Sequence, residues 1–394
     1  MRVLMFGWEF PPMSSGGLGT ACYGLTKGLS SLGVQVAFVM PHGPEDAYAQ
    51  YVHLIPASKA LRTVRLSSGL RPYLSVSRPF YRTRGQARLA VLYGDDLFHE
   101  VQRLAELARG IAQEEQFDVI HCHDWMTFPA GMAAKEASGK PLIVHVHATE
   151  FDRTGGNNVN QAVYDIERQG MHAADLVIAV SQFTKDKLVA HYGVSPDKIA
   201  VVHNAIDPEF IDYGEKKGKM VLFLGRITLQ KGPDYFLEAA RRCLEVDPDI
   251  RFVIAGSGDM EGRLIERAAA LGIGDKVLFP GFVTGPDLDR LYQMADLYVM
   301  PSVSEPFGIT PLEALKNKTP VIVSRTSGVS EVLRHCLKVD FWDTEKLASK
   351  ILSVLRYREA HHLLKEHGYQ EVQGFSWQNP AKKCVEVYKR ACHG

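Results

Sequence analysis

The sequence predicts an α/β protein built from two doubly wound domains of similar size. Its 394 residues exceed what one ordinary hydrophobic core accommodates, so two domains are expected. In both halves, short apolar runs typical of buried strands alternate with segments whose apolar residues recur at helical spacing. A polar, glycine-containing stretch at residues 211–219, IDYGEKKGK, separates the two patterns and is typical of an interdomain linker.

Composition and charge narrow the class of protein. The chain is 46% apolar and 23% charged, and its 45 basic residues balance 45 acidic ones, which argues against nucleic acid as the main partner. Six cysteines include no CxxC pair, so reduced thiols are expected. The N-terminal apolar run ends before Glu9 and is too short for a signal peptide or a membrane span. We therefore expect a cytoplasmic protein with no integral membrane segment.

The first half, residues 1–210, begins with a βαβ pattern. A strand at Val3–Phe6 leads through Gly16-Gly17-Leu18-Gly19 into a helix at Ala21–Leu32, and a strand follows at Val34–Met40. The glycine spacing differs from GxGxxG, so a dinucleotide site is only weakly indicated. Glycines that let the backbone approach an anion are the alternative interpretation.

Further along the first half, strands are expected where apolar runs end in polar residues. These strands are Val119–Cys122, Leu142–Val146, Leu176–Val180 and Ile199–His203, after an amphipathic helix at Asp95–Ala112. Residues 42–90 are less regular, with short strands expected near Val52–Ile55, Val64–Leu66 and Tyr73–Val76.

The second half, residues 220–376, repeats the alternation and predicts a second Rossmann-like parallel sheet. Its strands are expected at Met220–Leu224, Arg251–Ala255, Val277–Phe279, Leu297–Met300 and Pro320–Ser324, with helices such as Tyr235–Glu245 and Glu261–Leu271. A last helix at Trp377–Cys392 is expected within residues 377–394, packing back on the first domain.

The stretch from Met300 to Ser324 contains a helix start that follows a strand. Thr310 is a suitable N-cap, Pro311 fits the first helical position, and Glu313 stands where a capping box places its acidic residue. In α/β proteins, anionic ligands bind at such strand ends. Glu313 is therefore either a capping residue or a ligand contact.

Glu305, in the loop before that helix, has less structural explanation. Pro306 fixes the backbone after it, and Gly308 permits close approach of a ligand. These features favour a binding role for Glu305.

The strand at Met220–Leu224 ends in GRITLQKGP, which places two cations in one loop. Arg226 offers a fork for phosphate oxygens and Lys231 a point charge nearby. Charge-assisted hydrogen bonds of about 1.5–3 kcal/mol each suit a departing diphosphate. The alternative is a pair of solvated surface cations.

Two glycine turns at later strand ends are weaker candidates. Gly256-Ser257-Gly258 exposes backbone, and Gly281-Phe282-Val283 could border a flat base. A strand-end glycine is more often a turn than a site.

Four histidines at two strand ends raise the question of a metal. His121 and His123 share one strand face, as do His145 and His147, and Asp124 is adjacent in sequence. The cysteines lie off any recognised ligand spacing, so no metal is expected. One histidine is expected to bond a ligand hydroxyl, with the others satisfied in the core.

Together these motifs resemble the retaining glycosyltransferases of the GT-B fold, family 4, with glycogen- and starch-synthase-like members. The resemblance covers both halves through GGLG at Gly16, HDW at His123, HATE at His147, GRx4KG at Gly225 and Ex7E at Glu305. It implies two Rossmann-like domains facing across a cleft, the first on the acceptor side and the second on the donor side.

The resemblance also implies residue roles. Arg226 and Lys231 would bind the donor diphosphate, Glu305 would lie near the donor sugar, and His147 would bond the sugar beside the reacting carbon; these four form the catalytic set. Glu313 would bind the ribose. The remaining donor contacts would be Gly16, Gly17, Gly256, Phe282, Val283, Gly308, Ile309 and Thr310, and the sugar or acceptor side would include Asp124, Trp125 and Glu150.

Sugar transfer with retention, without a metal or other cofactor, is what the resemblance implies. The donor would be a nucleoside-diphosphate sugar, with ADP- or UDP-glucose favoured, and the acceptor a glycan or small carbohydrate, with α-1,4-glucan the best single choice. Ser14-Ser15 replaces the usual Lys-x before Gly-Gly, and Asn204-Ala205 replaces Asn-Gly, which leaves the base and sugar open. Domain closure about the 211–219 linker is expected, and the oligomeric state is open.

Two other functions are compatible with the same motifs. A nucleotide-sugar epimerase or hydrolase could use the same two-domain cleft, and would give an altered or hydrolysed sugar without an acceptor product. A non-catalytic nucleotide- or glycan-binding module would bind without turnover.

Overall fold

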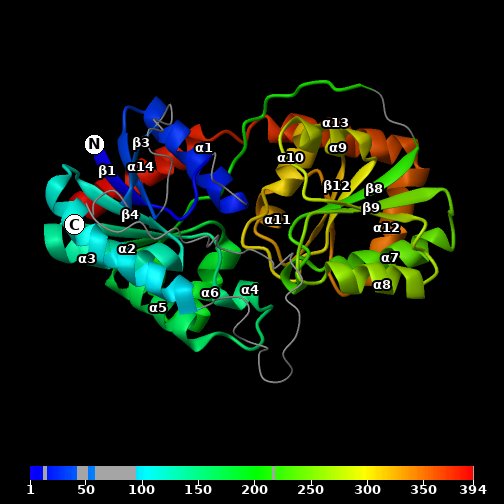
Figure 1. The fold of residues 1–394 in the computed structure, drawn as a ribbon. Helices are drawn as coiled ribbons and strands as arrows, with labels where there is room; N and C mark the ends of the chain where they lie inside the picture. Colours follow the sequence, from blue (N-terminus) through cyan, green and yellow to red (C-terminus); the bar gives the residue numbers. More distant parts are fainter. Residues whose placement is uncertain (12–15, 42–51, 58–94, 215–217, 394) are drawn as a thin grey trace, which may run out of the picture. The chain divides into compact units, whose positions relative to one another are not determined.

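The computed structural model describes residues 1–11, 16–41, 52–57, 95–214 and 218–393. The chain forms two compact units, shown in Figure 1. Unit 1 comprises Met1–Glu150, Asn158–Ala205 and Trp377–Gly394, and unit 2 comprises Phe151–Asn157 and Ile206–Ser376. The main division thus falls ahead of the expected linker at 211–219, and a short segment from the first half of the sequence belongs to unit 2.

Unit 1 contains a seven-stranded parallel sheet in the order β3-β2-β1-β4-β5-β6-β7. The strands are β1 Arg2–Phe6, β2 Gln35–Met40, β3 His53–Pro56, β4 Val119–His123, β5 Leu142–Val146, β6 Leu176–Ala179 and β7 Ile199–Val201. All residues of β4 and β5 are buried, as expected for strands covered on both faces. Their register pairs His123 with His145.

Helices lie on both faces of this sheet (Figure 1). They are α1 Gly17–Ser31, α2 Asp95–Glu114, α3 Phe128–Ser138, α4 Glu150–Arg153, α5 Gln161–Ala173, α6 Gln182–Tyr192 and α14 Gln378–His393, with α4 crossing into unit 2. The terminal α14 packs closely on α1: a Cβ on Gly24 would lie 2.0 Å from the Trp377 ring, and one on Gly28 2.4 Å from the Trp377 carbonyl. Glycine at these two positions therefore permits the close packing.

Unit 2 contains a six-stranded parallel sheet in the order β10-β9-β8-β11-β12-β13. The strands are β8 Lys219–Leu224, β9 Ile250–Ala255, β10 Val277–Gly281, β11 Leu297–Met300, β12 Val321–Ser324 and β13 Leu337–Val339. The helices are α7 Pro233–Leu244, α8 Glu261–Ala270, α9 Pro286–Met294, α10 Thr310–Lys316, α11 Val329–Val332, α12 Thr344–Arg356 and α13 Arg358–Val372. Helices α7, α8 and α12 pack together, as do α9, α10 and α13 (Figure 1).

The expected strands agree with the observed ones to within about two residues at each end, as is usual for boundaries read from sequence. Helix α1 starts at Gly17, four residues before the expected start, so the glycine turn forms the first turn of the helix. The strands expected at 64–66 and 73–76, and Ser14-Ser15, lie outside the described residues. Within the described residues, no helix combines the length and apolar character needed to cross a membrane.

Candidate functional site

The loop after β8 positions the two cations of the predicted diphosphate site. Backbone hydrogen bonds from Gly225 to Ala255 and from Ile227 to Ser257 hold this loop against the one after β9. A Cβ on Gly256, whose φ is 132°, would lie 1.9 Å from the Gly225 carbonyl oxygen. Gly256 is therefore required by the close approach of the two loops.

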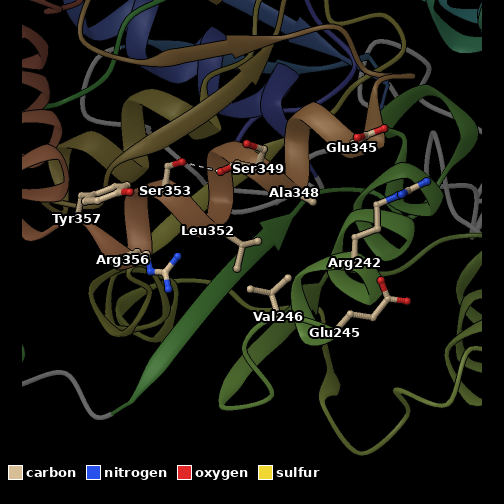
Figure 2. A pocket seen from close by; sticks show the side chains of 10 residues that line it. All are labelled: Arg242, Glu245, Val246, Glu345, Ala348, Ser349, Leu352, Ser353, Arg356 and Tyr357. Carbon is tan, nitrogen blue, oxygen red and sulfur yellow. Dashed lines mark hydrogen bonds between the residues drawn. The ribbon is translucent and has the colours of Figure 1, made fainter.

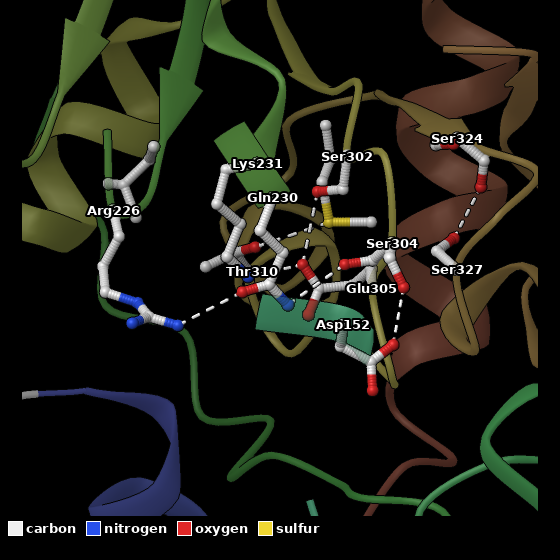
Figure 3. Close-up of polar contacts among 12 residues, drawn as sticks. Asp152, Arg226, Gln230, Lys231, Ser302, Ser304, Glu305, Thr310, Ser324 and Ser327 are labelled. Carbon is white, nitrogen blue, oxygen red and sulfur yellow. Dashed lines mark hydrogen bonds and ion pairs between the residues drawn. The ribbon is translucent and has the colours of Figure 1, made fainter. Parts of the chain in front are cut away.

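Lys231 and Glu305 form an ion pair in unit 2 (Figure 3). The Lys231 ammonium donates to Glu305 Oε2 at 2.5 Å, and the Ser302 hydroxyl donates to the same oxygen at 3.3 Å. The Glu305 side chain is 8% exposed and that of Lys231 22%. An ion pair this sheltered from water is stronger than a solvated surface pair, and the reading of Lys231 as a surface cation is wrong.

Gln230 links the two loops and was not singled out from the sequence. Its Oε1 accepts from Arg226 Nη2 at 3.3 Å, and its Nε2 donates to the Ser304 carbonyl at 3.1 Å. The side chain is buried, so both hydrogen bonds are sheltered from water. The guanidinium of Arg226 is thereby oriented by Gln230, as Figure 3 shows.

Asp152, on α4, also reaches the loop that carries Glu305. Asp152 is fully buried, and its Oδ1 accepts from the Ser304 hydroxyl at 2.5 Å. Residues 151–157 belong to unit 2, and this contact is one that joins them to it. The glutamate-bearing loop is thus fixed on both sides, by Gln230 and by Asp152.

The capping box expected at the start of helix α10 does not form. The helix includes Thr310, and its N-cap is Ile309 with no side-chain cap bond. The Thr310 hydroxyl instead accepts from the Tyr298 hydroxyl at 2.8 Å. Glu313 accepts from the Tyr292 hydroxyl at 3.0 Å, so its carboxylate is held by a tyrosine on α9 and not by the helix start.

Burial raises the pKa of Glu313 above its usual range, while the hydrogen bond from Tyr292 acts in the opposite direction. The bond from Tyr292 favours the ionised form and so limits the rise. In either form the carboxyl oxygens of Glu313 can accept hydrogen bonds from ligand hydroxyls.

The remaining donor-side candidates differ in exposure. Gly308 has a φ of 99°, which favours glycine, and a Cβ there would lie 3.1 Å from Glu305 Cγ. Ile309 and Val283 are half-buried, and Phe282 is 65% exposed. An exposed aromatic ring after β10 remains a candidate for stacking on a base.

In unit 1, the four predicted histidines lie together at the ends of β4 and β5. The ring centroids of His121 and His123 are 4.4 Å apart, and those of His145 and His147 are 4.2 Å apart, both pairs stacked. His123 Nδ1 lies 2.8 Å from His147 Nε2, and His121 Nε2 lies 3.3 Å from His145 Nδ1. We call His121, His123, His145 and His147 the histidine cluster.

Burial lowers the pKa of every histidine in the cluster, because a charged imidazolium would lose its hydration. The pKa falls to about 3 for both His121 and His147. All four imidazoles are therefore neutral near pH 7, and each offers one lone pair and one N–H.

Asp124 holds the loop that carries His147. Its Oδ1 accepts from the backbone N–H groups of His147 at 2.7 Å and Ala148 at 3.3 Å, and its own φ is 60°. Asp124 is 4% exposed. The residue thus positions His147 through the backbone.

Two sugar-side candidates are buried instead of lining a surface. Trp125 is fully buried, with its ring 5.6 Å from that of Phe98. Glu150 is 2% exposed, and its Oε1 accepts from the Asn160 backbone N–H at 3.3 Å. Because both side chains are buried, the structure does not support contact of either with sugar or acceptor. Their positions near His123 and His147 in the sequence gave no indication of this burial.

Gly16 and Gly17 are exposed at the start of α1. Among the described residues, no heavy atom lies within 4 Å of a Cβ built on either. Nothing in that part of the chain explains a preference for glycine here, so room for a ligand beside the backbone is a reason to keep both as candidates.

Two family profiles together span nearly the whole chain. The profile "Glycosyltransferase Family 4" matches residues 15–210, and "Glycosyl transferases group 1" matches residues 207–390. An uncharacterised glycosyltransferase of Methanocaldococcus jannaschii is 33% identical, with 99% of this chain and 98% of that protein covered. The chain belongs to the family 4 glycosyltransferases.

Further similarities place this glycosyltransferase within the family and its fold. A glycogen synthase of Mycobacterium tuberculosis is 27% identical over 100% of this chain and 96% of its own length. An Anabaena protein solved in complex with UDP and glucose superposes with a TM-score of 0.73 at 16% identity, covering 99% and 100% of the two chains. The fold is GT-B, with two Rossmann-like parallel-sheet units.

The glycosyltransferase brings its predicted residues together in two groups. Arg226, Lys231, Glu305, Gly308 and Glu313 lie in unit 2, and the histidine cluster with Asp124 lies in unit 1. Sequence reasoning missed the supporting residues Gln230, Ser304, Asp152 and Tyr292. Gln230 stands inside the GRx4KG motif, which was the one available signal for it.

A separate pocket of about 360 Å³ lies between α7 and α12 in unit 2 (Figure 2). Its lining includes Arg242, Val246, Leu352 and Arg356. It contains none of the predicted site residues of the glycosyltransferase.

Proposed function

We propose that this glycosyltransferase moves a hexose, with glucose the best choice, from a nucleoside-diphosphate sugar to a glycan with retention of the anomeric configuration. The observation that carries the proposal is the sheltered pair of Lys231 and Glu305 in unit 2, with Arg226 in the same loop as Lys231 and held by Gln230. Group 1 glycosyltransferases use nucleotide-sugar donors. The proposal assigns the donor diphosphate to these cations.

Arg226 and Lys231 would hold the diphosphate as it leaves. Lys231 has three N–H donors and uses one on Glu305, so the others are available to phosphate oxygens. Charge-assisted hydrogen bonds contribute about 1.5–3 kcal/mol each. Because the charge on the leaving diphosphate grows in the transition state, preorganised cations lower the barrier to transfer.

Glu305 and Glu313 would contact the two sugars of the donor. Glu305 fixes the Lys231 ammonium and would lie near the transferred sugar, with the backbone of Gly308 to Thr310 beside it. Glu313, held by the hydroxyl of Tyr292, would accept from the ribose hydroxyls. Phe282 and Val283 would border the base.

On the unit 1 side, His147 would bond the transferred sugar near its reacting carbon. His123 Nδ1, 2.8 Å from His147 Nε2, and Asp124, through the His147 backbone N–H, fix its position. The Gly17 backbone would help to bind the diphosphate. In this mechanism the diphosphate leaves and the acceptor hydroxyl attacks on the same face of the sugar, and the departing phosphate oxygen takes the acceptor proton.

The similarities favour glucose as the sugar and a glucan as the acceptor. The M. tuberculosis relative is named a glycogen synthase, and the Anabaena structure contains UDP and glucose. These support ADP- or UDP-glucose as donor and α-1,4-glucan as acceptor for this chain. The Ser14-Ser15 sequence before Gly16 is the reason to test both bases.

A panel of nucleotide sugars and acceptors tests the proposal. The purified chain is incubated with ADP- and UDP-linked hexoses and with maltooligosaccharides or smaller carbohydrates, and released nucleoside diphosphate is measured. Proton NMR of the product reports the new anomeric centre. We expect diphosphate release with a glucose donor and an α-linked product. No release with any pair, or a β-linked product, would contradict the proposal.

A further inference from the structure

The histidine cluster contains three imidazoles placed as metal ligands. One ring nitrogen from each of His121, His123 and His145 lies within 4.8 Å of the other two. All three side chains are buried, with exposed fractions of 0%, 0% and 2%. From the sequence we expected no metal, because the cysteines lie off any recognised ligand spacing; the sheet register that pairs His123 with His145 was not available there.

The distance between His121 and His145 fits a shared ion. His121 Nε2 lies 3.3 Å from His145 Nδ1, which is long for a hydrogen bond between two nitrogens. Two imidazoles on one tetrahedral zinc, each at about 2.0–2.1 Å, have nitrogens about 3.3–3.4 Å apart. The pair thus has the separation of two ligands before any side chain moves.

Two buried ring nitrogens also lack partners. His123 Nε2 and His145 Nε2 have no hydrogen-bond partner among the described residues, although both atoms are inaccessible to water. Buried polar atoms of this kind are normally satisfied. His123 can therefore offer Nε2 to an ion, and His145, whose Nδ1 faces His121, would keep its hydrogen on the unpartnered Nε2. The soft terminal torsion of histidine allows the ring rotation that closes the remaining gap.

Tyr388 supplies the support that metal-binding histidines usually have. Its hydroxyl lies 2.7 Å from His121 Nδ1, so that nitrogen can donate its hydrogen to the tyrosine oxygen while Nε2 keeps its lone pair for an ion. A partner on the second ring nitrogen fixes the tautomer and the orientation of a metal ligand. Tyr388 comes from α14, which packs against β4 and β5.

We propose that His121, His123 and His145 bind one transition-metal dication, with zinc as the first choice, inside unit 1. Neutral imidazoles suit zinc, cobalt, nickel and copper and do not suit magnesium or calcium, which prefer oxygen. Three nitrogen ligands leave the fourth coordination position of a tetrahedral zinc ion open to water. The ion joins β4 to β5 and, through Tyr388, to α14. The role proposed for the ion is structural, and because its test measures metal content and not activity, the result would not decide the proposed function.

Metal content of the native protein is the first test. The full chain without a histidine tag is expressed with zinc in the medium, purified by gel filtration and analysed by mass spectrometry of the elements. We expect about one zinc per chain, near zero in His145→Asn, and an unchanged value in His99→Gln, an exposed histidine on α2 that serves as the matched control.

A second measurement keeps the proposal testable if His145→Asn does not fold. Wild-type protein stripped with a chelator and given Co²⁺ should take up one equivalent, with the intense visible bands of a low-coordinate cobalt site, and its melting temperature should rise. Tyr388→Phe should weaken binding by about 10–100-fold, as loss of a ligand's hydrogen-bond partner does. Wild-type protein that neither carries nor takes up an equivalent of either metal, or equal affinity in folded His145→Asn, would overturn the proposal.

Discussion

The two groups of predicted residues use opposite electrostatics. In unit 2, Arg226, Lys231 and Glu305 are charged, and the Lys231 side chain keeps 22% of its surface exposed. In unit 1, the histidine cluster is neutral, because burial lowers the pKa of each ring; His121, His123 and His145 are buried and His147 is half-buried. Charge with partial exposure suits the binding of an anion, whereas neutral buried imidazoles suit hydrogen bonding and metal coordination.

This difference indicates which unit should contribute most of the binding energy for the donor. An anionic diphosphate gains most from the cations of unit 2, and the neutral His147 can add hydrogen bonds only. Substitutions of Lys231 and Glu305 in unit 2 should therefore cost more activity than substitutions that act through His147.

Lys231→Ala should have the largest effect. It removes a cation from the leaving diphosphate and leaves Glu305 sheltered without its partner, so kcat should fall by at least about 10²–10³-fold. Steady-state kinetics with the best donor measure this. Lys219→Ala is the matched control, since Lys219 forms an exposed ion pair with Asp247 at the other end of β8. Near-normal turnover in folded Lys231→Ala would remove its assigned role.

Glu305→Gln should have the second largest effect. The glutamine keeps the size of the side chain but loses the charge that orients Lys231, and one charge-assisted bond of about 1.5–3 kcal/mol corresponds to a loss of about 10–150-fold in kcat/KM. Thermal unfolding shows whether the fold survives. An unchanged kcat/KM would show that Glu305 does not orient the cation.

Asp124→Ala should lower both stability and activity. Two backbone N–H groups, of His147 and Ala148, lose their acceptor, which costs about 1–3 kcal/mol, and alanine is strained at a φ of 60°. We expect a drop of about tenfold in kcat with a lower melting temperature. Asp124→Asn keeps an acceptor oxygen and a side chain of the same size, and at φ 60° and ψ 168° it is no more strained than aspartate, so it should be close to wild type. Equal losses in both variants would contradict a positioning role.

Tyr292→Phe should have the smallest effect and a dependence on pH. Removing the hydroxyl raises the pKa of Glu313 further, since the bond favours the charged carboxylate. The Michaelis constant for the donor should rise as the pH falls, and should begin to rise at a higher pH than in the wild type. Tyr357→Phe, at an exposed tyrosine, is the control. Identical pH profiles would argue against a role for charged Glu313.

Much of the fold could be predicted from sequence because buried parallel strands appear as continuous apolar runs. β5 and β11 match the expected Leu142–Val146 and Leu297–Met300 in both bounds. Sheet order could not be predicted, since nothing local in a strand specifies which neighbour it pairs with.

The site was predictable at its charged residues and not at their supports. Arg226, Lys231 and Glu305 stand in recognisable loops, whereas Asp152 meets Ser304 across 152 positions of sequence. The capping box failed at Thr310 because Tyr298, brought close by the fold, offered its hydroxyl a different partner. The resemblance implied that Trp125 lies on the sugar or acceptor side, and only packing shows that its ring is enclosed.

Calorimetric titration of the nucleoside diphosphate into the folded protein tests the central claim most directly. If Arg226 and Lys231 bind the diphosphate, Arg226→Ala and Lys231→Ala should each raise the Kd by about 10–150-fold, which corresponds to about 1.5–3 kcal/mol, while Lys219→Ala should leave it unchanged. The same Kd in wild type, Arg226→Ala and Lys231→Ala would contradict the claim that these cations hold the donor.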